Sequence, residues 1–198
     1  MHAILDEALY CHVGFSIEAQ PYVIPTVHAR AGDELYLHGS VASRMLGTLT
    51  ASTPLCVSVT LLDGLVLARS GFNHSMNYRS VVILGRAREL TVEIAKRAAL
   101  DALIERVLPG RAAQVRTAST KELNATCVLS LPIEEASAKI RSGPPHDDEE
   151  DYALGCWAGV LPLKLTALAP EPDPRLPAGV PVPAGLSGWS RGRPAGES

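Results

Sequence analysis

The sequence lacks the features of membrane, secreted and nucleic-acid-binding proteins. No stretch reaches the roughly 18 uninterrupted apolar residues of a membrane helix, and the first residues lack the basic segment and apolar run of a secretion signal. We therefore expect a cytoplasmic protein with no membrane partner. With 18 basic and 21 acidic residues the net charge is −3, so the basic surface needed for nucleic acid is not expected either.

Cysteine pairs and metal-ligand spacings are also missing. Cys11, Cys56, Cys127 and Cys156 are far apart, and no Cys or His stands at a metal-binding spacing from them. Free and largely buried thiols are the expected state. The acidic run at 146–151, HDDEED, could be a site for a hard cation, but clustered acids without a loop-forming glycine favour a solvated turn. No metal is predicted.

Aromatic residues are few, with two Phe and two Trp, whereas hydrophobic residues make up 46% of the 198 residues. A core of Val, Leu, Ile and Ala is expected, and the length suits one domain. From residue 170 onward the composition changes to seven Pro and five Gly with no periodicity. We therefore predict a folded domain at 1–168 and a disordered tail at 169–198.

Alternating and apolar segments predict an antiparallel sheet. Residues 18–20 form a tight link in a first hairpin, and Pro25 places the second strand at an edge or irregularity. Asp63 and Gly64 predict another hairpin turn, and Gly85 predicts a bulge or bend in a long strand. The predicted strands are 10–17, 21–30, 34–38, 55–62, 65–70, 78–90, 127–131 and 157–165.

Helices are expected in three places. A short one follows the third strand at about 43–49, and the longest begins after Thr91 as a cap and ends before Pro109. A further short helix starts near Ser119 or Thr120. Many antiparallel strands with few helices are consistent with a small barrel, which removes exposed sheet edges by closure.

The segment at 34–49, ELYLHGSVASRMLGTL, is a strand that enters a helix through small residues. Such a turn can hold an anion, because the helix start offers free N–H groups, Ser40 and Ser43 offer hydroxyls, and Arg44 can bind a phosphate with two hydrogen bonds. The alternative is an ordinary strand, turn and helix with a surface arginine.

Three segments give the chain a family resemblance: LYLHGSVASRML, NYRSVVILGRAREL and WAGVLPLKL. Together they resemble the pyridoxamine 5'-phosphate oxidase-like flavin-binding split barrels, in the branch that includes nitroimidazole-resistance proteins. The resemblance covers about residues 5–167. It implies a mainly β (α+β) antiparallel split barrel that binds FMN, and a homodimer with the flavin at its interface.

The resemblance also implies which residues contact the flavin. A turn holds its phosphate, a strand lies against its ring, and a second strand approaches it near the dimer interface. The turn that holds the phosphate contains Gly39, Ser40, Ser43 and Arg44. The strand against the ring contains Val23, Ile24, Pro25 and Thr26, and the second strand contributes Tyr78, Arg79 and Ser80. Tyr78 and Arg79 could equally form a structural pair.

His38 matches the active-site histidine of the nitroimidazole-resistance branch, so it is both a predicted cofactor contact and the candidate catalytic residue. A strand histidine bonded to a neighbouring carbonyl is the alternative. Met45 stands where the oxidases have a lysine, so one phosphate-binding cation is missing. Oxidation of pyridoxamine phosphate is therefore not expected.

The resulting hypothesis is an FMN-dependent oxidoreductase that reduces a small electrophilic substrate. Two alternatives remain at this point. One is a haem-binding split barrel with His38 or His74 as axial ligand, and the other is a flavin store or sensor without turnover.

Overall fold

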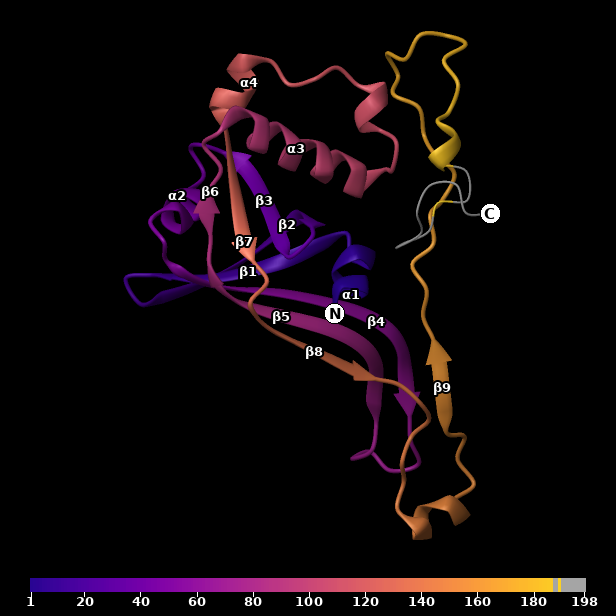
Figure 1. The fold of residues 1–198 in the computed structure, drawn as a ribbon. Coiled ribbons are helices and arrows are strands. Elements are labelled where there is room, and N and C mark those ends of the chain that lie inside the picture. Colours follow the sequence, from indigo (N-terminus) through magenta and orange to yellow (C-terminus); the bar gives the residue numbers. More distant parts are fainter. Residues whose placement is uncertain (187–188, 190–198) are drawn as a thin grey trace.

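A computed structural model describes residues 1–186 and 189 (Figure 1). The strands are β1 (Tyr10–Ile17), β2 (Gln20–Ala31), β3 (Glu34–Ser40), β4 (Pro54–Leu67), β5 (Ser75–Arg86), β6 (Arg88–Glu89), β7 (Thr126–Pro132), β8 (Glu135–Arg141) and β9 (Gly159–Pro162). The helices are α1 (His2–Glu7), α2 (Arg44–Thr50), α3 (Glu93–Val107) and α4 (Thr120–Ala125), with short 3-10 turns at Ala112–Gln114, Glu149–Ala153 and Ala184–Leu186.

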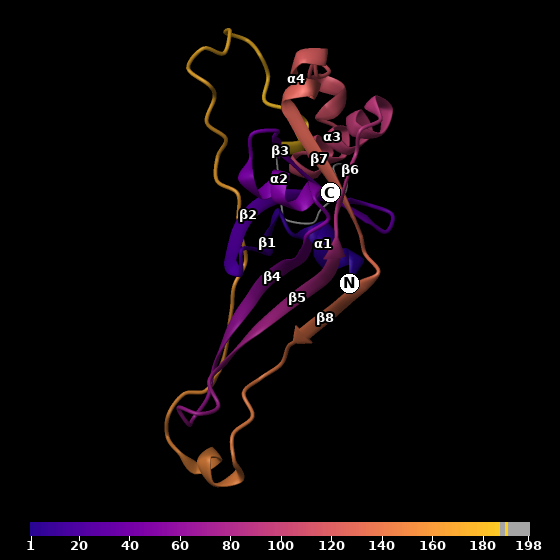
Figure 2. The same ribbon diagram turned by 90° about the vertical axis from the view of Figure 1, so that its left-hand side faces the viewer.

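The strands form one curled antiparallel sheet in the order β6-β7-β3-β2-β1-β4-β5-β8, and β9 pairs with the end of β4. Figures 1 and 2 show that the β3 and β7 end turns away from the long β4 and β5 ribbon, so the sheet wraps into a half-barrel. This confirms the predicted mainly β split-barrel fold.

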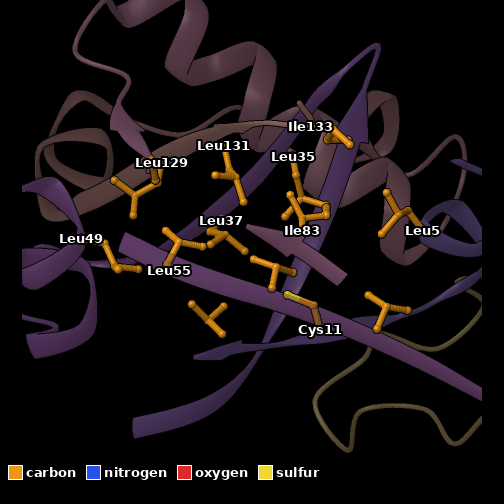
Figure 3. Close-up of a cluster of buried hydrophobic side chains, with 14 of the residues drawn as sticks. Leu5, Cys11, Leu35, Leu37, Leu49, Leu55, Ile83, Leu129, Leu131 and Ile133 are labelled. Atoms are coloured by element: carbon orange, nitrogen blue, oxygen red, sulfur yellow. The ribbon is translucent and has the colours of Figure 1, made fainter. Parts of the chain in front are cut away.

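The core lies inside the curl of the sheet. Alternate side chains of β1, β3, β4, β5 and β7 point inward, while Leu49 of α2 and Leu5 of α1 lie at opposite sides of the cluster (Figure 3). Leu35, Leu37 and Leu129 are fully buried. Each such leucine contributes about 1.5–3 kcal/mol relative to an exposed one, which makes this cluster the main source of stability.

Two local predictions are confirmed. The first hairpin turns at Glu18 and Ala19, whose φ angles of 49° and 64° are those of a tight two-residue turn. The short helix α4 begins after Ser119, whose side chain accepts a hydrogen bond from the Glu122 N–H while Glu122 binds back to the Ser119 N–H. In both cases neighbouring residues decide the conformation.

The predicted hairpin turn at Asp63 and Gly64 is wrong. β4 runs straight through these residues with an irregularity between Leu62 and Gly64, and the chain reverses only between β4 and β5 at residues 68–74. The reason is tertiary. β9 pairs along Gly64–Leu67, and a Cβ on Gly64 would lie 3.1 Å from the Leu161 carbonyl oxygen, so this glycine allows close approach of β9.

The long strand predicted at 78–90 and its helix cap also need correction. β5 ends at Arg86 and the chain passes at Ala87 into β6, so Gly85 lies within a regular pair with Leu55. A Cβ on Gly85 would lie 2.9 Å from Leu131 Cδ1. Val92 rather than Thr91 caps α3, with no side-chain hydrogen bond.

The sequence patterns missed α1 and β8. α1 has only six residues, and β8 is largely exposed, so neither shows a clear hydrophobic period. Both are held by tertiary contacts, β8 through its ladder to β5. Within the part of the chain that the structure describes, no helix is long and apolar enough to cross a membrane.

After β9 the chain continues as an extended C-terminal arm, residues 163–186 (Figures 1 and 2). The arm is exposed through Val182 and ends in a 3-10 turn, where a Cβ on Gly185 would lie 3.3 Å from Leu108 Cδ1. Disorder of 169–198 stays a prediction, and its last residues, apart from Trp189, lie outside the described chain.

We expect deletion of 170–198 to leave the flavin content unchanged and to shift the melting temperature by less than about 3 °C, the equivalent of roughly 1 kcal/mol for a domain of this size. The physical reason is the small apolar area that this segment buries against its own chain. Differential scanning fluorimetry of full-length and shortened protein tests this. A melting temperature lower by several degrees would show that the arm docks.

Candidate cofactor site

The sheet opens between β2 and β3. β2 pairs with β1 along Gln20–Val27, but it pairs with β3 only along His28–Ala31. β3 continues beside β7 to Ser40 and leaves β2 after Leu37. Among the described residues, no strand pairs with the other side of β2 at Val23–Thr26. Pro25 therefore lies on a partial edge strand, as predicted, and backbone groups there are open to a ligand.

The four predicted ring-contact residues divide into two faces. Val23 is 68% exposed and Pro25 is also exposed, so both project outward. Ile24 and Thr26 are half-buried, and Ile24 packs against the core. Only one face of this strand can therefore present side chains to a flavin.

The predicted phosphate-binding turn is tighter than expected. Gly39 and Ser40 still belong to β3, and the chain turns at Val41 and Ala42 before Ser43 caps α2. A Cβ on Gly39 would lie 2.9 Å from Leu46 Cδ1, so the glycine lets α2 pack closely on β3.

Both serine hydroxyls lie at this turn. Ser40 Oγ accepts a hydrogen bond from the Ala42 N–H (3.2 Å), and Ser43 Oγ accepts one from the Leu46 N–H (3.4 Å). Because each oxygen acts as acceptor, its own hydrogen stays available to donate to an anion. The two side chains are thus oriented by the backbone and still able to bind phosphate.

Arg44 brings the turn and the edge of β2 together. Its guanidinium lies over the Tyr22 ring, 4.8 Å from the ring centroid, and Tyr22 stacks on Phe15. Next to this pair is a depression of about 630 Å³ whose lining includes Tyr22, Val23 and Leu84. A cation, two hydroxyls and an open apolar depression are the elements that a nucleotide with a flat ring requires.

His38 is half-buried near the end of β3. No group among the described residues forms a hydrogen bond with its buried Nδ1 atom. The alternative, a histidine bonded to a neighbouring carbonyl, is therefore not realised through Nδ1. Burial lowers the pKa of His38, which keeps the ring neutral at pH 7. A neutral imidazole can donate one hydrogen bond and accept another.

Sequence reasoning overlooked His28. Its ring is fully buried, with Nε2 3.0 Å from the Leu5 carbonyl oxygen, and burial lowers its pKa. It holds α1 against β2. The signal in the sequence was its place in the second strand next to Ala29, and these two are the buried residues of β2.

Tyr78, Arg79 and Ser80 lie far from the turn in the same chain. Arg86, at the end of β5, donates to the Ser52 carbonyl just beyond α2. Tyr78 lies eight residues earlier in the same strand, about 26 Å from Arg86 at 3.3 Å per residue. The Tyr78 ring lies under the Lys139 ammonium, 5.9 Å away. One chain therefore does not unite the three predicted groups of flavin contacts.

Arg79 is the centre of an ion network. Its Nε and Nη2 atoms donate to Asp63 at 2.7 Å each, Nη2 donates to Glu7 at 2.9 Å, and Nη1 donates to the other Glu7 oxygen. These hydrogen bonds, first those to Asp63, raise the pKa of the guanidinium. Arg79 joins α1, β4 and β5, and its predicted contact with a flavin stays a prediction.

Comparison with known proteins identifies the family. The sequence profile of the family described as pyridoxamine 5'-phosphate oxidase matches residues 1–140. The chain belongs to this family. The match includes β1–β7 and every residue predicted above to contact the flavin. None of the curated proteins compared with the chain matches it.

Two solved structures share much of the sequence. The flavocytochrome Anf3 from Azotobacter vinelandii is 45% identical, covers 95% of this chain and 87% of its own, and superposes with a TM-score of 0.89. The FAD and heme binding protein from Mycobacterium smegmatis is 41% identical, with 96% and 93% covered and a TM-score of 0.91.

A more distant relative shares the fold. A protein assigned to 5-nitroimidazole antibiotic resistance from Bacteroides thetaiotaomicron is 23% identical, with 69% of this chain and 80% of that chain covered and a TM-score of 0.59. The matches to the two similar structures extend beyond the family profile and reach into the C-terminal arm.

Proposed function

We propose that this protein binds a flavin nucleotide and haem and acts as an oxidoreductase. The main observation in support of flavin binding is the turn at Ser40, Ser43 and Arg44 beside the open edge of β2. Support for the second cofactor comes from the two structures at 45% and 41% identity, one named as a flavocytochrome and the other as an FAD- and haem-binding protein. This joins the flavin hypothesis with the haem alternative.

The phosphate nearest the flavin ring would bind at the turn. Arg44 supplies the positive charge, and the hydroxyl hydrogens of Ser40 and Ser43 supply two donors. The predicted cofactor is FMN, while one relative is named for FAD. Both nucleotides carry this phosphate, so the turn fits either, and the identity of the bound flavin decides between them.

Bound flavin and haem would supply the electron-transfer chemistry. The chain would position the ring against the outward face of Val23 and Pro25, and its half-buried neutral His38 would exchange a proton with a small substrate or orient it. A small electrophile such as a nitroaromatic compound is the substrate class that we propose to assay first.

The absorption spectrum of the purified protein tests this proposal, together with mass spectrometry of the released cofactors. We expect a flavin spectrum and a Soret band. Protein purified from cells supplied with riboflavin and a haem precursor that carries neither cofactor would contradict the proposal. Absence of turnover with NADH, NADPH or dithionite-reduced flavin, with cofactors bound, would instead favour a flavin store or sensor.

We also propose a homodimer whose interface contains the flavin. The outer face of β4 and β5 includes Val82, which is half-buried between the fully buried Val81 and Ile83 of the opposite face. Leu84, on the same outer face, lines the depression beside Val23. A second copy that covers this face would therefore close the depression, and it could bring its Tyr78 strand toward the flavin.

Val82→Arg is expected to lower both the dimer fraction and the flavin occupancy, because a charge would be buried in the interface. Light scattering and the ratio of flavin to protein absorbance measure the two effects. Ile94→Arg is the matched control, since Ile94 is 78% exposed on α3 and should tolerate the change. A monomeric wild-type protein with full flavin occupancy would contradict the proposal.

A further inference from the structure

A second cavity lies on the outer face of the sheet, beyond the candidate flavin site. It has a volume of about 510 Å³ and is enclosed by three segments that are far apart in the sequence. These are Ala8–Tyr10 with His12, Thr60–Leu62 of β4, and residues 163–165 after β9. The volume lies in the range of about 300–1,000 Å³ that is usual for small-molecule and cofactor sites.

The lining combines apolar walls with one imidazole and one cation. Leu62, Leu163 and Leu165 are 39%, 37% and 47% exposed, a large apolar area for side chains that face a cavity. His12 makes an edge contact with the Tyr10 ring at 5.5 Å, and no hydrogen bond among the described residues uses its ring nitrogens. Lys164 adds a positive charge.

The walls of this cavity are tied together by the Arg79 network. Glu7 directly precedes Ala8, and Asp63 directly follows Leu62, so Arg79 fixes two walls at once. The Leu163 N–H donates to the Asp63 carbonyl oxygen at 3.0 Å, which attaches the third wall. Arg106 further donates to the Ala8 carbonyl oxygen at 2.6 Å. The cavity is therefore held open by the fold before any ligand binds.

Haem matches this set of groups. It is a flat, largely apolar ring with two carboxylates and an iron that accepts an imidazole nitrogen as axial ligand. We propose that this cavity holds haem, with His12 as the axial ligand and Lys164 paired with a haem carboxylate. This inference rests on the proposed function, since it assigns a place to the second cofactor named there.

The two histidines predicted from the sequence have poorer positions for this role. His38 lies near the flavin turn, where a haem would compete with the flavin for the same opening. His74 lies exposed on the loop between β4 and β5, with its Nδ1 atom 2.8 Å from the Ser70 carbonyl oxygen. That bond leaves Nε2 able to bind a metal, so His74 is the strongest competing candidate.

The test compares the full-length variants His12→Ala, His38→Ala and His74→Ala after reconstitution with hemin. Haem per chain, flavin per chain, the Soret position and far-UV circular dichroism are measured for each. We expect His12→Ala to lose at least tenfold in haem affinity and to keep its flavin, while the other two variants bind haem as the wild type does. Lys164→Ala should weaken haem binding a few-fold without moving the Soret band.

A cavity variant separates ligation from a purely structural role. His12→Gly supplied with free imidazole should regain the wild-type Soret position, because imidazole can occupy the vacated ligand position. Wild-type haem binding by His12→Ala, or loss confined to His74→Ala or His38→Ala, would overturn the assignment. A wild-type protein that binds flavin but no hemin would contradict the haem half of the proposed function, and this assignment with it.

Discussion

Replacing Arg79 with alanine is expected to lower the free energy of unfolding by about 2–4 kcal/mol, because the change leaves two partly buried carboxylates without their shared cation. Glu7, Asp63 and Arg79 have side chains only 21%, 31% and 28% exposed, so water replaces the lost hydrogen bonds incompletely. For a chain of this length the melting temperature should fall by about 6–12 °C. Chemical denaturation followed by circular dichroism measures the free energy.

Arg116→Ala is the matched control. Arg116 also binds a carboxylate with two nitrogen atoms, but its side chain is 72% exposed and that of Glu122 is 47% exposed. An ion pair exposed to water contributes little to stability, so this variant should remain close to wild type. Equal losses for the two variants would show that the Arg79 network has no special structural role.

Haem reconstitution adds a second readout for Arg79. Arg79→Lys keeps the charge and loses the planar fork that spans Glu7 and Asp63. If the network fixes the walls of the cavity at His12, this variant should remain folded and bind hemin more weakly. If the folded Arg79→Lys protein bound hemin with unchanged affinity, the Arg79 network would contribute to global stability without determining the shape of the cavity.

Replacing Arg44 with alanine is expected to weaken binding of the flavin nucleotide about 10- to 100-fold, since a charge-assisted hydrogen bond to phosphate is worth about 1.5–3 kcal/mol. Riboflavin has no phosphate, so its affinity should be nearly unchanged. Fluorescence titration of the apoprotein with FMN, FAD and riboflavin measures all three affinities. It also shows which of the two nucleotides binds more tightly.

Arg116→Ala serves again as the control, because Arg116 binds Glu122 of α4 and lies neither at the turn nor in the lining of the depression. It should leave all three affinities at wild-type values. An equal loss of riboflavin and FMN in Arg44→Ala would assign Arg44 to support of the Tyr22 ring, over which it lies, rather than to phosphate binding.

The local chain chemistry explains which parts of the site were predictable. Ser40, Ser43 and Arg44 lie within five residues, so one strand, turn and helix places them together, and the structure adds only that Arg44 reaches Tyr22. The edge position of Pro25 was also predictable, because proline cannot donate to a neighbouring strand. Contacts between residues that are close in sequence can be predicted without knowledge of the fold.

Arg79 shows where this reasoning stops. Its motif indicated a cofactor contact, but Glu7 is 72 residues away in the sequence and lies in a helix that no pattern predicted. The Asp63–Gly64 pair had the composition of a hairpin turn, and the approach of β9 from about 100 residues later made it a continuous strand instead. A partner distant in sequence can thus reverse a local preference.

The sequence by itself determined the family, the antiparallel strands, the capped helix α4 and the turn that carries Arg44, because each depends on neighbouring residues or on a linear motif. Only the tertiary structure decided the partners of Arg79, the burial of His28 and the cavity at His12. That cavity has walls from residues 8–12, 60–62 and 163–165. Their meeting depends on how the sheet curls and on where β9 docks, which no short segment of the chain specifies.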